Sequence, residues 1–162
     1  MITTSKHTIK IFSAIIVLFV LLRWSMGGFD FSYFIVAGSQ SCDQSATQIT
    51  VQPGYSYDGE YYYRYALAPF NTDNPYRGIT VSAPAYRQQR IFYPVVTWLL
   101  SIGGTDWAVP FMLVLINIGC FIFYLIGVKK LLEYWKIQFH YIILALLIPG
   151  IWMALARDLA EV

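Results

Sequence analysis

The chain has little charge and few cysteines. Charged residues make up only 12% of the sequence, whereas ordinary soluble domains carry roughly 25%. The net charge of +2 is too small to suggest nucleic acid as a partner. There are two cysteines, Cys42 in a polar segment and Cys120 in an apolar one, and they suggest no disulfide framework. These shortages argue against an ordinary soluble domain, a nucleic-acid-binding protein and a disulfide scaffold.

Apolar and aromatic residues dominate instead. Hydrophobic residues make up 57% of the chain, and the mean hydropathy is +0.54. Aromatic residues reach 18%, including 13 tyrosines and 5 tryptophans. Tyrosine and tryptophan rings favour the boundary between membrane and water. The composition therefore predicts a membrane protein.

Three apolar segments predict membrane-spanning helices, which need about 20 residues each. They cover about residues 9–26, 107–128 and 137–156. The first could instead be a signal-peptide core, but Arg23 and Trp24 follow it where a small-residue cleavage site would be expected. The shorter apolar run 91–102 predicts an interfacial or re-entrant helix. We therefore expect an all-α membrane protein with about three transmembrane helices, one interfacial helix and one large outer loop.

The lysines indicate the orientation. All five lie before the first span or between the last two: Lys6, Lys10, Lys129, Lys130 and Lys136. The positive-inside rule then puts the N-terminus and the 129–136 loop in the cytoplasm. The outer loop, about residues 27–106, holds six of the nine acidic residues. The expected location is the inner (plasma) membrane, with several passes.

Three membrane-spanning helices are too few to enclose a sizeable site between them. The charged run 157–161 begins just as the third span should reach the outer face. We therefore expect residues 1–162 to be the N-terminal portion of one larger polytopic domain, or a protomer that needs further membrane segments or subunits.

Asp58 is the leading candidate for a catalytic group in the outer loop. It lies in the tyrosine-rich stretch 57–69, just before an expected short helix. One interpretation is a plain helix N-cap, and the other is a general base that takes a proton from an attacking hydroxyl. Asp30 is the second candidate, because a carboxylate at the outer mouth of a span is costly unless it is paired or functional. For Asp30, pairing with Arg23 or ordinary solvation remains the alternative.

Glu60 follows Asp58 after one residue and is a candidate for substrate binding. An Asp-x-Glu pair could bind a divalent ion if water and a substrate phosphate completed the shell. Two carboxylates are too few to argue for a metal, so no cofactor is expected.

The arginines of the outer loop predict phosphate contact, because a guanidinium fork matches phosphate geometry. Arg64 lies in the tyrosine run, and Arg87 and Arg90 immediately precede the 91–102 segment. The phosphate could belong to a substrate or to lipid headgroups. The tyrosines, Tyr61 and Tyr62 among them, could form an interfacial belt or a sugar-stacking platform.

These motifs resemble the C-type (GT-C) membrane glycosyltransferases. The stretch Tyr57-Asp58-Gly59-Glu60-Tyr61-Tyr62-Tyr63-Arg64-Tyr65-Ala66 is similar to the Trp-Asp-Gly-x-x-Tyr-x-x-Ile-Ala signature of the GPI-mannosyltransferase-like branch. Arg90-Ile91-Phe92-Tyr93-Pro94 resembles that branch's Phe-Pro-Leu-Tyr-Pro element, and the likeness covers about residues 29–128. Tyr57 stands where the family has Trp, and the family has many more spans.

The resemblance implies inverting glycosyl transfer from a polyprenyl-phosphate-linked sugar to an acceptor at the outer face. Asp58 matches the family's catalytic Asp, and Asp30 resembles the equivalent Asp of a sibling branch. This short chain alone is expected to be inactive. The alternatives are a non-catalytic membrane subunit whose loop binds a partner, and a fragment of a transporter or flippase. A transporter would be expected to carry charges deep within its spans, and residues 107–128 carry none.

Overall fold

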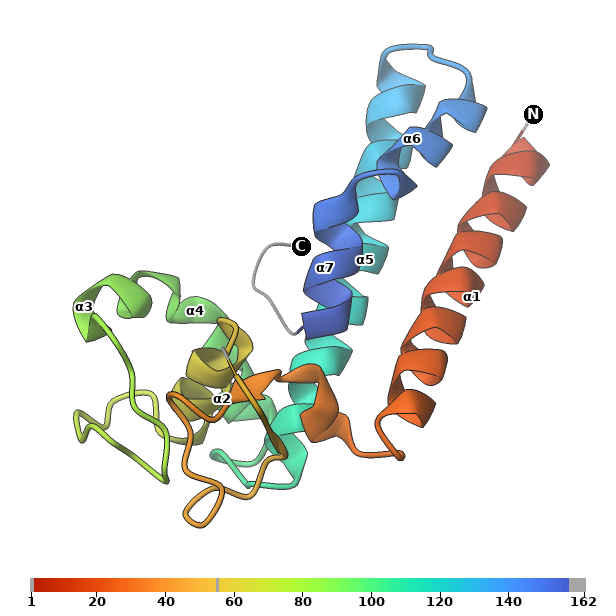
Figure 1. Ribbon diagram of the computed structural model, residues 1–162. Coiled ribbons are helices and arrows are strands. Elements are labelled where there is room, and N and C mark those ends of the chain that lie inside the picture. The colour runs from red at the N-terminus through yellow and green to blue at the C-terminus, as the bar shows by residue number, and fades with distance from the viewer. Residues whose placement is uncertain (1, 55, 158–162) are drawn as a thin grey trace.

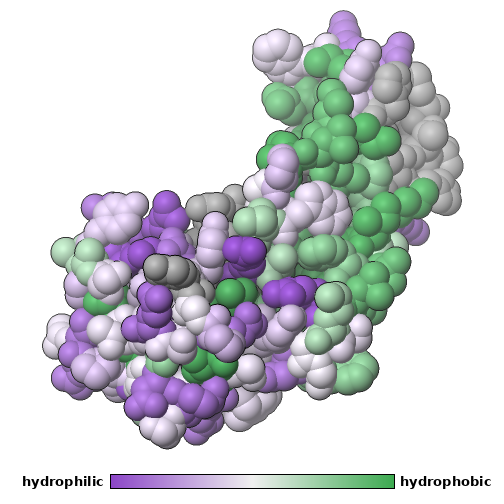
Figure 2. All heavy atoms as spheres, in the orientation of Figure 1, coloured by the Kyte–Doolittle hydropathy of each residue, from purple (hydrophilic) through white to green (hydrophobic). Residues whose placement is uncertain are grey.

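Two long helices dominate the computed structural model, which describes residues 2–54 and 56–157. They are α1 (Ile2–Met26) and α5 (Ala108–Tyr134). Over Ile9–Met26 and Ala108–Tyr134 both are long and apolar enough to cross a membrane. Only 17% and 28% of these segments is buried, so neither resembles the core helix of a soluble protein. Figure 2 shows apolar side chains lying open along the upper arm of the molecule, which contains these two helices together with the short helices that follow α5 (Figure 1).

The segment expected to be the third span is not one continuous helix. It consists of η3 (Phe139–Ile142), α6 (Ile143–Leu146) and α7 (Pro149–Arg157). Proline has no N–H and its ring clashes within a helix, so Pro149 begins a new helix rather than continuing the old one. The indole N–H of Trp152 donates to the carbonyl of Leu146 at 2.7 Å, which satisfies one acceptor at the break. The stretch runs back along α5 (Figure 1).

Short elements fill the connection between α1 and α5. They are η1 (Phe31–Phe34), β1 (Ala37–Gly38), β2 (Val51–Gln52), α2 (Gly59–Leu67), α3 (Pro84–Arg87), η2 (Gln88–Arg90) and α4 (Phe92–Leu100). β1 and β2 form a small parallel pair, in which Ala37 lies opposite Val51. The expected helix in the 91–102 segment is present as α4. Figure 1 shows this body at one end of the molecule, away from the N-terminus.

Helix α2 is the centre of this body. All of its residues are buried, and it packs against α4 and α5. Two glycines allow close backbone approach at its ends. A Cβ on Gly59 would lie 2.5 Å from the carbonyl oxygen of Ile35 and 2.8 Å from that of Arg157. A Cβ on Gly104 would lie 2.3 Å from the carbonyl oxygen of Leu67. The helix is therefore fixed against Ile35, Gly104 and the end of α7.

A polar contact joins α4 to α5 inside the main core. The hydroxyl of Tyr93 donates to the carbonyl of Leu113 at 3.0 Å, and the side-chain amide of Asn117 donates to that hydroxyl at 3.0 Å. The ring of Tyr93 packs edge-on against Tyr62 of α2. Asn117, the strongly polar residue of the second span, is thus a satisfied buried group.

Candidate functional site

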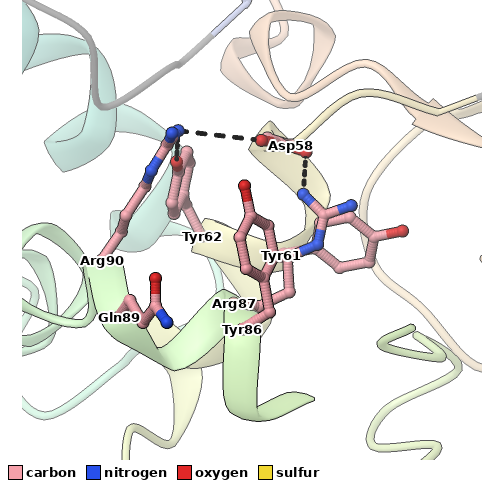
Figure 3. Close-up of a pocket in the computed structure, with 7 residues that line it drawn as sticks. All are labelled: Asp58, Tyr61, Tyr62, Tyr86, Arg87, Gln89 and Arg90. Atoms are coloured by element: carbon pink, nitrogen blue, oxygen red, sulfur yellow. Dashed lines mark hydrogen bonds and ion pairs between the residues drawn. The ribbon is translucent and has the colours of Figure 1, made fainter. Parts of the chain in front are cut away.

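A small pocket lies between α2 and the segment formed by α3 and η2. Its volume is about 60 Å³. It is lined by Asp58, Tyr61, Tyr62, Tyr86, Arg87, Gln89 and Arg90 (Figure 3). One carboxylate and two guanidinium groups leave the lining with an excess of one positive charge. The structure therefore brings the leading catalytic candidate together with two of the three predicted phosphate ligands.

Asp58 occupies the N-cap position of α2, but within the described residues its side chain makes no capping hydrogen bond. Arg87 instead donates from Nη1 to one carboxylate oxygen, and Nη1 of Arg90 lies 4.0 Å from the other. Figure 3 shows the two arginines reaching the carboxylate from opposite sides. The Asp58 side chain is 33% exposed. A plain N-cap role thus does not describe this side chain.

Tyrosines hold the two guanidinium groups. Arg87 lies over the ring of Tyr61, with its Cζ 4.2 Å from the ring centroid. Its Nε is buried and has no hydrogen-bond partner among the described residues. Arg90 donates to the hydroxyl of Tyr62 at 3.3 Å. A cation over an aromatic face is stabilised by the ring quadrupole, and more so where water is excluded.

The local sequence explains how α3 and η2 present these groups. Ala83 adopts a left-handed conformation (φ 48°), and Pro84 then takes the first helical position. In the short helical run, spacings of three and four residues place Tyr86, Gln89 and Arg90 on one face. Every residue of α3 and η2 is exposed or half-buried, so side-chain contacts with α2 hold the segment in place.

Asp30 lies outside this pocket. Its carboxylate accepts hydrogen bonds from the backbone N–H of Ser32 at 2.8 Å and from the hydroxyl of Thr50 at 3.1 Å, and so caps η1. Arg23, its suggested partner, instead donates to the carbonyl of Ala156 at 3.2 Å and stacks over Tyr33. In this structure Asp30 has a local capping role.

Glu60 also lies outside the pocket, because residues two apart on a helix point to different sides. It is fully buried, and Oε2 accepts from the backbone N–H of Gly38 at 3.3 Å and from the thiol of Cys42 at 3.1 Å. Oε1 is buried with no hydrogen-bond partner among the described residues. Burial, together with the hydrogen bond to Glu60, raises the pKa of the Cys42 thiol far above its ordinary value.

Arg64 braces the loop that follows α2. It is 2% exposed, and Nη2 donates to the carbonyls of Asn71 and Asp73, each at 2.8 Å. Its guanidinium group also lies against the rings of Tyr65 and Tyr76. Burial lowers the pKa of Arg64. The third predicted phosphate ligand is thus directed at backbone carbonyls, away from Asp58.

Two residues that line the pocket, Tyr86 and Gln89, were not predicted from the sequence. Tyr86 is 60% exposed and lines the pocket beside Arg87, and its place next to that arginine was a signal that could have found it. The end of α7 contacts the residue that precedes Asp58, since the Arg157 guanidinium lies 4.7 Å from the ring centroid of Tyr57. No sequence pattern indicates that contact.

In the part of the chain that the structure describes, no three His, Cys, Asp or Glu residues converge on a possible metal position. Comparison with known proteins finds no matching family model, no similar curated protein and no similar solved structure. The functional argument therefore rests on the pocket and on the motifs that form it.

Proposed function

We propose that this chain is part of a membrane glycosyltransferase that takes a sugar from a polyprenyl-phosphate carrier. The observation that carries the proposal is the carboxylate of Asp58 between the guanidinium groups of Arg87 and Arg90. The pocket offers a base for an acceptor hydroxyl beside cations for a phosphate that leaves. The resemblance of the stretch around Asp58 to the GT-C signature supports the role of Asp58 as the base.

In the proposed reaction, the acceptor oxygen bonds to the anomeric carbon as the bond from that carbon to the phosphate oxygen breaks. Asp58 takes the hydroxyl proton, and the polyprenyl phosphate leaves with the electron pair. Negative charge develops on the departing phosphate, so cations placed there stabilise the transition state more than the ground state. Single displacement inverts the anomeric configuration.

Arg87 must change partners for this to happen. It holds Asp58 in the structure, and a pocket of about 60 Å³ has no room for a sugar phosphate. We infer that the donor phosphate takes the place of Asp58 on Arg87, which frees the carboxylate. Because α3 and η2 bury no residue among those described, the segment can move without opening a core.

The proposal places this body at the outer face of the inner membrane. Figure 1 shows the start of α1 and the end of α5 together at the opposite end of the molecule, and Lys10, Lys129 and Lys130 belong to those ends. The positive-inside rule would put that end in the cytoplasm. α4 would then lie at the interface, the broken segment η3–α7 would be the third passage, and further membrane segments or subunits would complete the domain.

A non-catalytic membrane subunit is the second candidate. The small size of the pocket favours it, because an ion pair that fills its own pocket can be purely structural. The two functions differ in one measurement. Membranes containing the protein are supplied with a panel of polyprenyl-phosphate sugars labelled in the sugar. The measurement is the transfer of label from the carrier to an acceptor. Transfer above that of membranes lacking the protein supports the enzyme, and its absence across the panel favours the subunit.

A further inference from the structure

A second, larger pocket lies on the other side of the α3–η2 segment from Asp58. Its volume is about 240 Å³, against about 60 Å³ for the first. The segment divides its residues between the two pockets. Pro84, Ala85 and Gln88 line the second, and Tyr86, Arg87, Gln89 and Arg90 line the first. The segment is thus a thin wall with a different set of side chains on each side.

The second pocket has a buried floor and a polar rim. Arg64, Tyr65 and Val81 are almost fully buried and form the floor. The exposed rim consists of Thr72, Asp73, Asn74, Pro84, Ala85 and Gln88. The rim therefore combines hydroxyl, amide and carboxylate groups with the apolar carbon of Pro84 and Ala85. This combination suits a ligand that itself carries both hydroxyls and C–H groups.

Hydrogen bonds to the backbone fix the shape of this rim. The Asn74 side chain donates to the carbonyl of Val81 at 2.9 Å and accepts from its N–H at 2.8 Å. The side-chain oxygen of Asn71 accepts from the N–H of Asp73 at 2.7 Å. The hydroxyl of Tyr65 reaches the carbonyl of Pro84 at 3.5 Å. The 71–81 side of the rim, held in this way, is preorganised, which reduces the entropy lost on binding.

The charge of the lining favours a neutral ligand. Arg64 and Asp73 balance each other, and both terminal nitrogens of the guanidinium group donate to carbonyls, those of Ala68, Asn71 and Asp73. Its Nε is buried without a hydrogen-bond partner among the described residues. The lining as a whole carries no net charge, whereas in the first pocket Arg87 and Arg90 outnumber Asp58. The hydroxyl of Thr72 and the amide of Gln88 supply donors and acceptors to a neutral hydroxylated ring.

We propose that the second pocket binds one neutral sugar unit. The binding itself follows from the pocket, and its role rests on the proposed function. Because the α3–η2 wall separates the pocket from Asp58, the sugar it holds is not the one being transferred. It is a unit of the acceptor glycan away from the reacting hydroxyl. A sugar against Gln88 would also hold the wall that carries Arg87 and Arg90.

The test uses the full chain in lipid nanodiscs and ligand-observed saturation-transfer NMR. The probes are free glucose, galactose, mannose and N-acetylglucosamine. We expect at least one to receive saturation from the protein. Gln88→Ala and Gln89→Ala form a matched pair, since these neighbours line different pockets. Gln88→Ala should weaken sugar binding by about 3- to 10-fold, the worth of one neutral hydrogen bond, and Gln89→Ala should leave it unchanged.

Thr72→Trp provides a second test, because an indole at the exposed rim fills the opening and should abolish the signal. Binding of no probe, an equal effect of both glutamine variants, or full binding in Thr72→Trp would overturn the inference. Asp58→Asn separates it from the proposed function. Loss of transfer with sugar binding retained supports both proposals. If the wild-type protein binds sugar but transfers none, the result supports a sugar site in the second pocket and contradicts the proposed enzyme activity.

Discussion

Asp58, at the start of α2, is paired with Arg87, at the end of α3, 29 residues further along the chain. The pair ties the exposed segment formed by α3 and η2 to α2, in which every residue is buried. Partly exposed ion pairs contribute only about 0–1 kcal/mol to stability, so the pairing matters more for placing the side chains than for holding the fold. A phosphate bound to Arg87 would therefore compete with Asp58 for the same guanidinium group.

The arginines should not be replaceable by lysine. If Arg87 and Arg90 bind the donor phosphate, Arg→Lys keeps the charge but loses the bidentate fork. We expect a higher KM for the donor, or a lower kcat, in at least one of the two variants. Arg77→Lys is the matched control, because Arg77 pairs with Asp106 outside the pocket. Unchanged constants in both pocket variants would mean that the arginines only anchor the segment to headgroups, where either cation is worth about 1 kcal/mol.

Gly59→Ala should destabilise the protein. The new Cβ would lie 2.5 Å from a backbone carbonyl oxygen of Ile35, and overpacking of this kind typically costs about 1–3 kcal/mol. Gly119→Ala is the control, since a Cβ there meets no atom within 4 Å among the described residues and alanine is the better helix former by about 1 kcal/mol. Denaturation in detergent micelles, followed by circular dichroism, compares the two. Equal stability of both variants would contradict the close approach at Gly59.

Cys42 should be protected from alkylation in the folded protein. Its pKa is raised by burial and by the hydrogen bond to Glu60, and the thiolate is the reactive form. At pH 8 the unfolded chain ionises this thiol appreciably, and the folded chain does not. We expect alkylation at least about tenfold slower in the folded state, since one pKa unit is a tenfold change.

The alkylation is measured in Cys120→Ala, so that only Cys42 reports. The same variant unfolded in denaturant gives the reference rate. Equal rates in the folded and unfolded protein would show that the thiol is not enclosed with Glu60.

The orientation can be tested with reporter fusions at two positions. A fusion after Lys130 should read cytoplasmic and one near Asn71 external, because the lysines gather at one end of the molecule and the α2–α4 body lies at the other. A cytoplasmic Asn71 would put the pocket on the wrong face for the lipid-linked donor and would end the enzyme proposal.

The long helices could be predicted from sequence because an uncharged apolar run of about 20 residues is typical of a membrane-spanning helix. The broken third segment could have been predicted in part, since Pro149 lies inside it and proline favours a first helical position. The helix period could also have separated Asp58 from Glu60, because residues two apart face different sides. The different roles of Asp58 and Glu60 therefore follow from the helix period.

The pairing of Asp58 with Arg87 could not be predicted in the same way. It depends on how the loop between α2 and α3 folds back, and that loop is held by Arg64 and its contacts with the carbonyls of Asn71 and Asp73. Arg64 itself was expected to bind phosphate, since a sequence shows the charge of an arginine but not the acceptors it will meet. In the structure Arg64 is buried, and the acceptors it meets are backbone carbonyls.

The most direct test of the account is transfer activity in Asp58→Asn, assayed with the labelled polyprenyl-phosphate sugar panel. Asparagine keeps the shape of the side chain and removes the base, so we expect a loss of about 10²-fold or more. Asp106→Asn, which breaks the other Arg–Asp pair, should leave activity near that of the wild type, and so should Asp30→Asn. Near-normal transfer in Asp58→Asn, with insertion and abundance unchanged, would contradict the account, and loss in Asp30→Asn alone would move the base to Asp30.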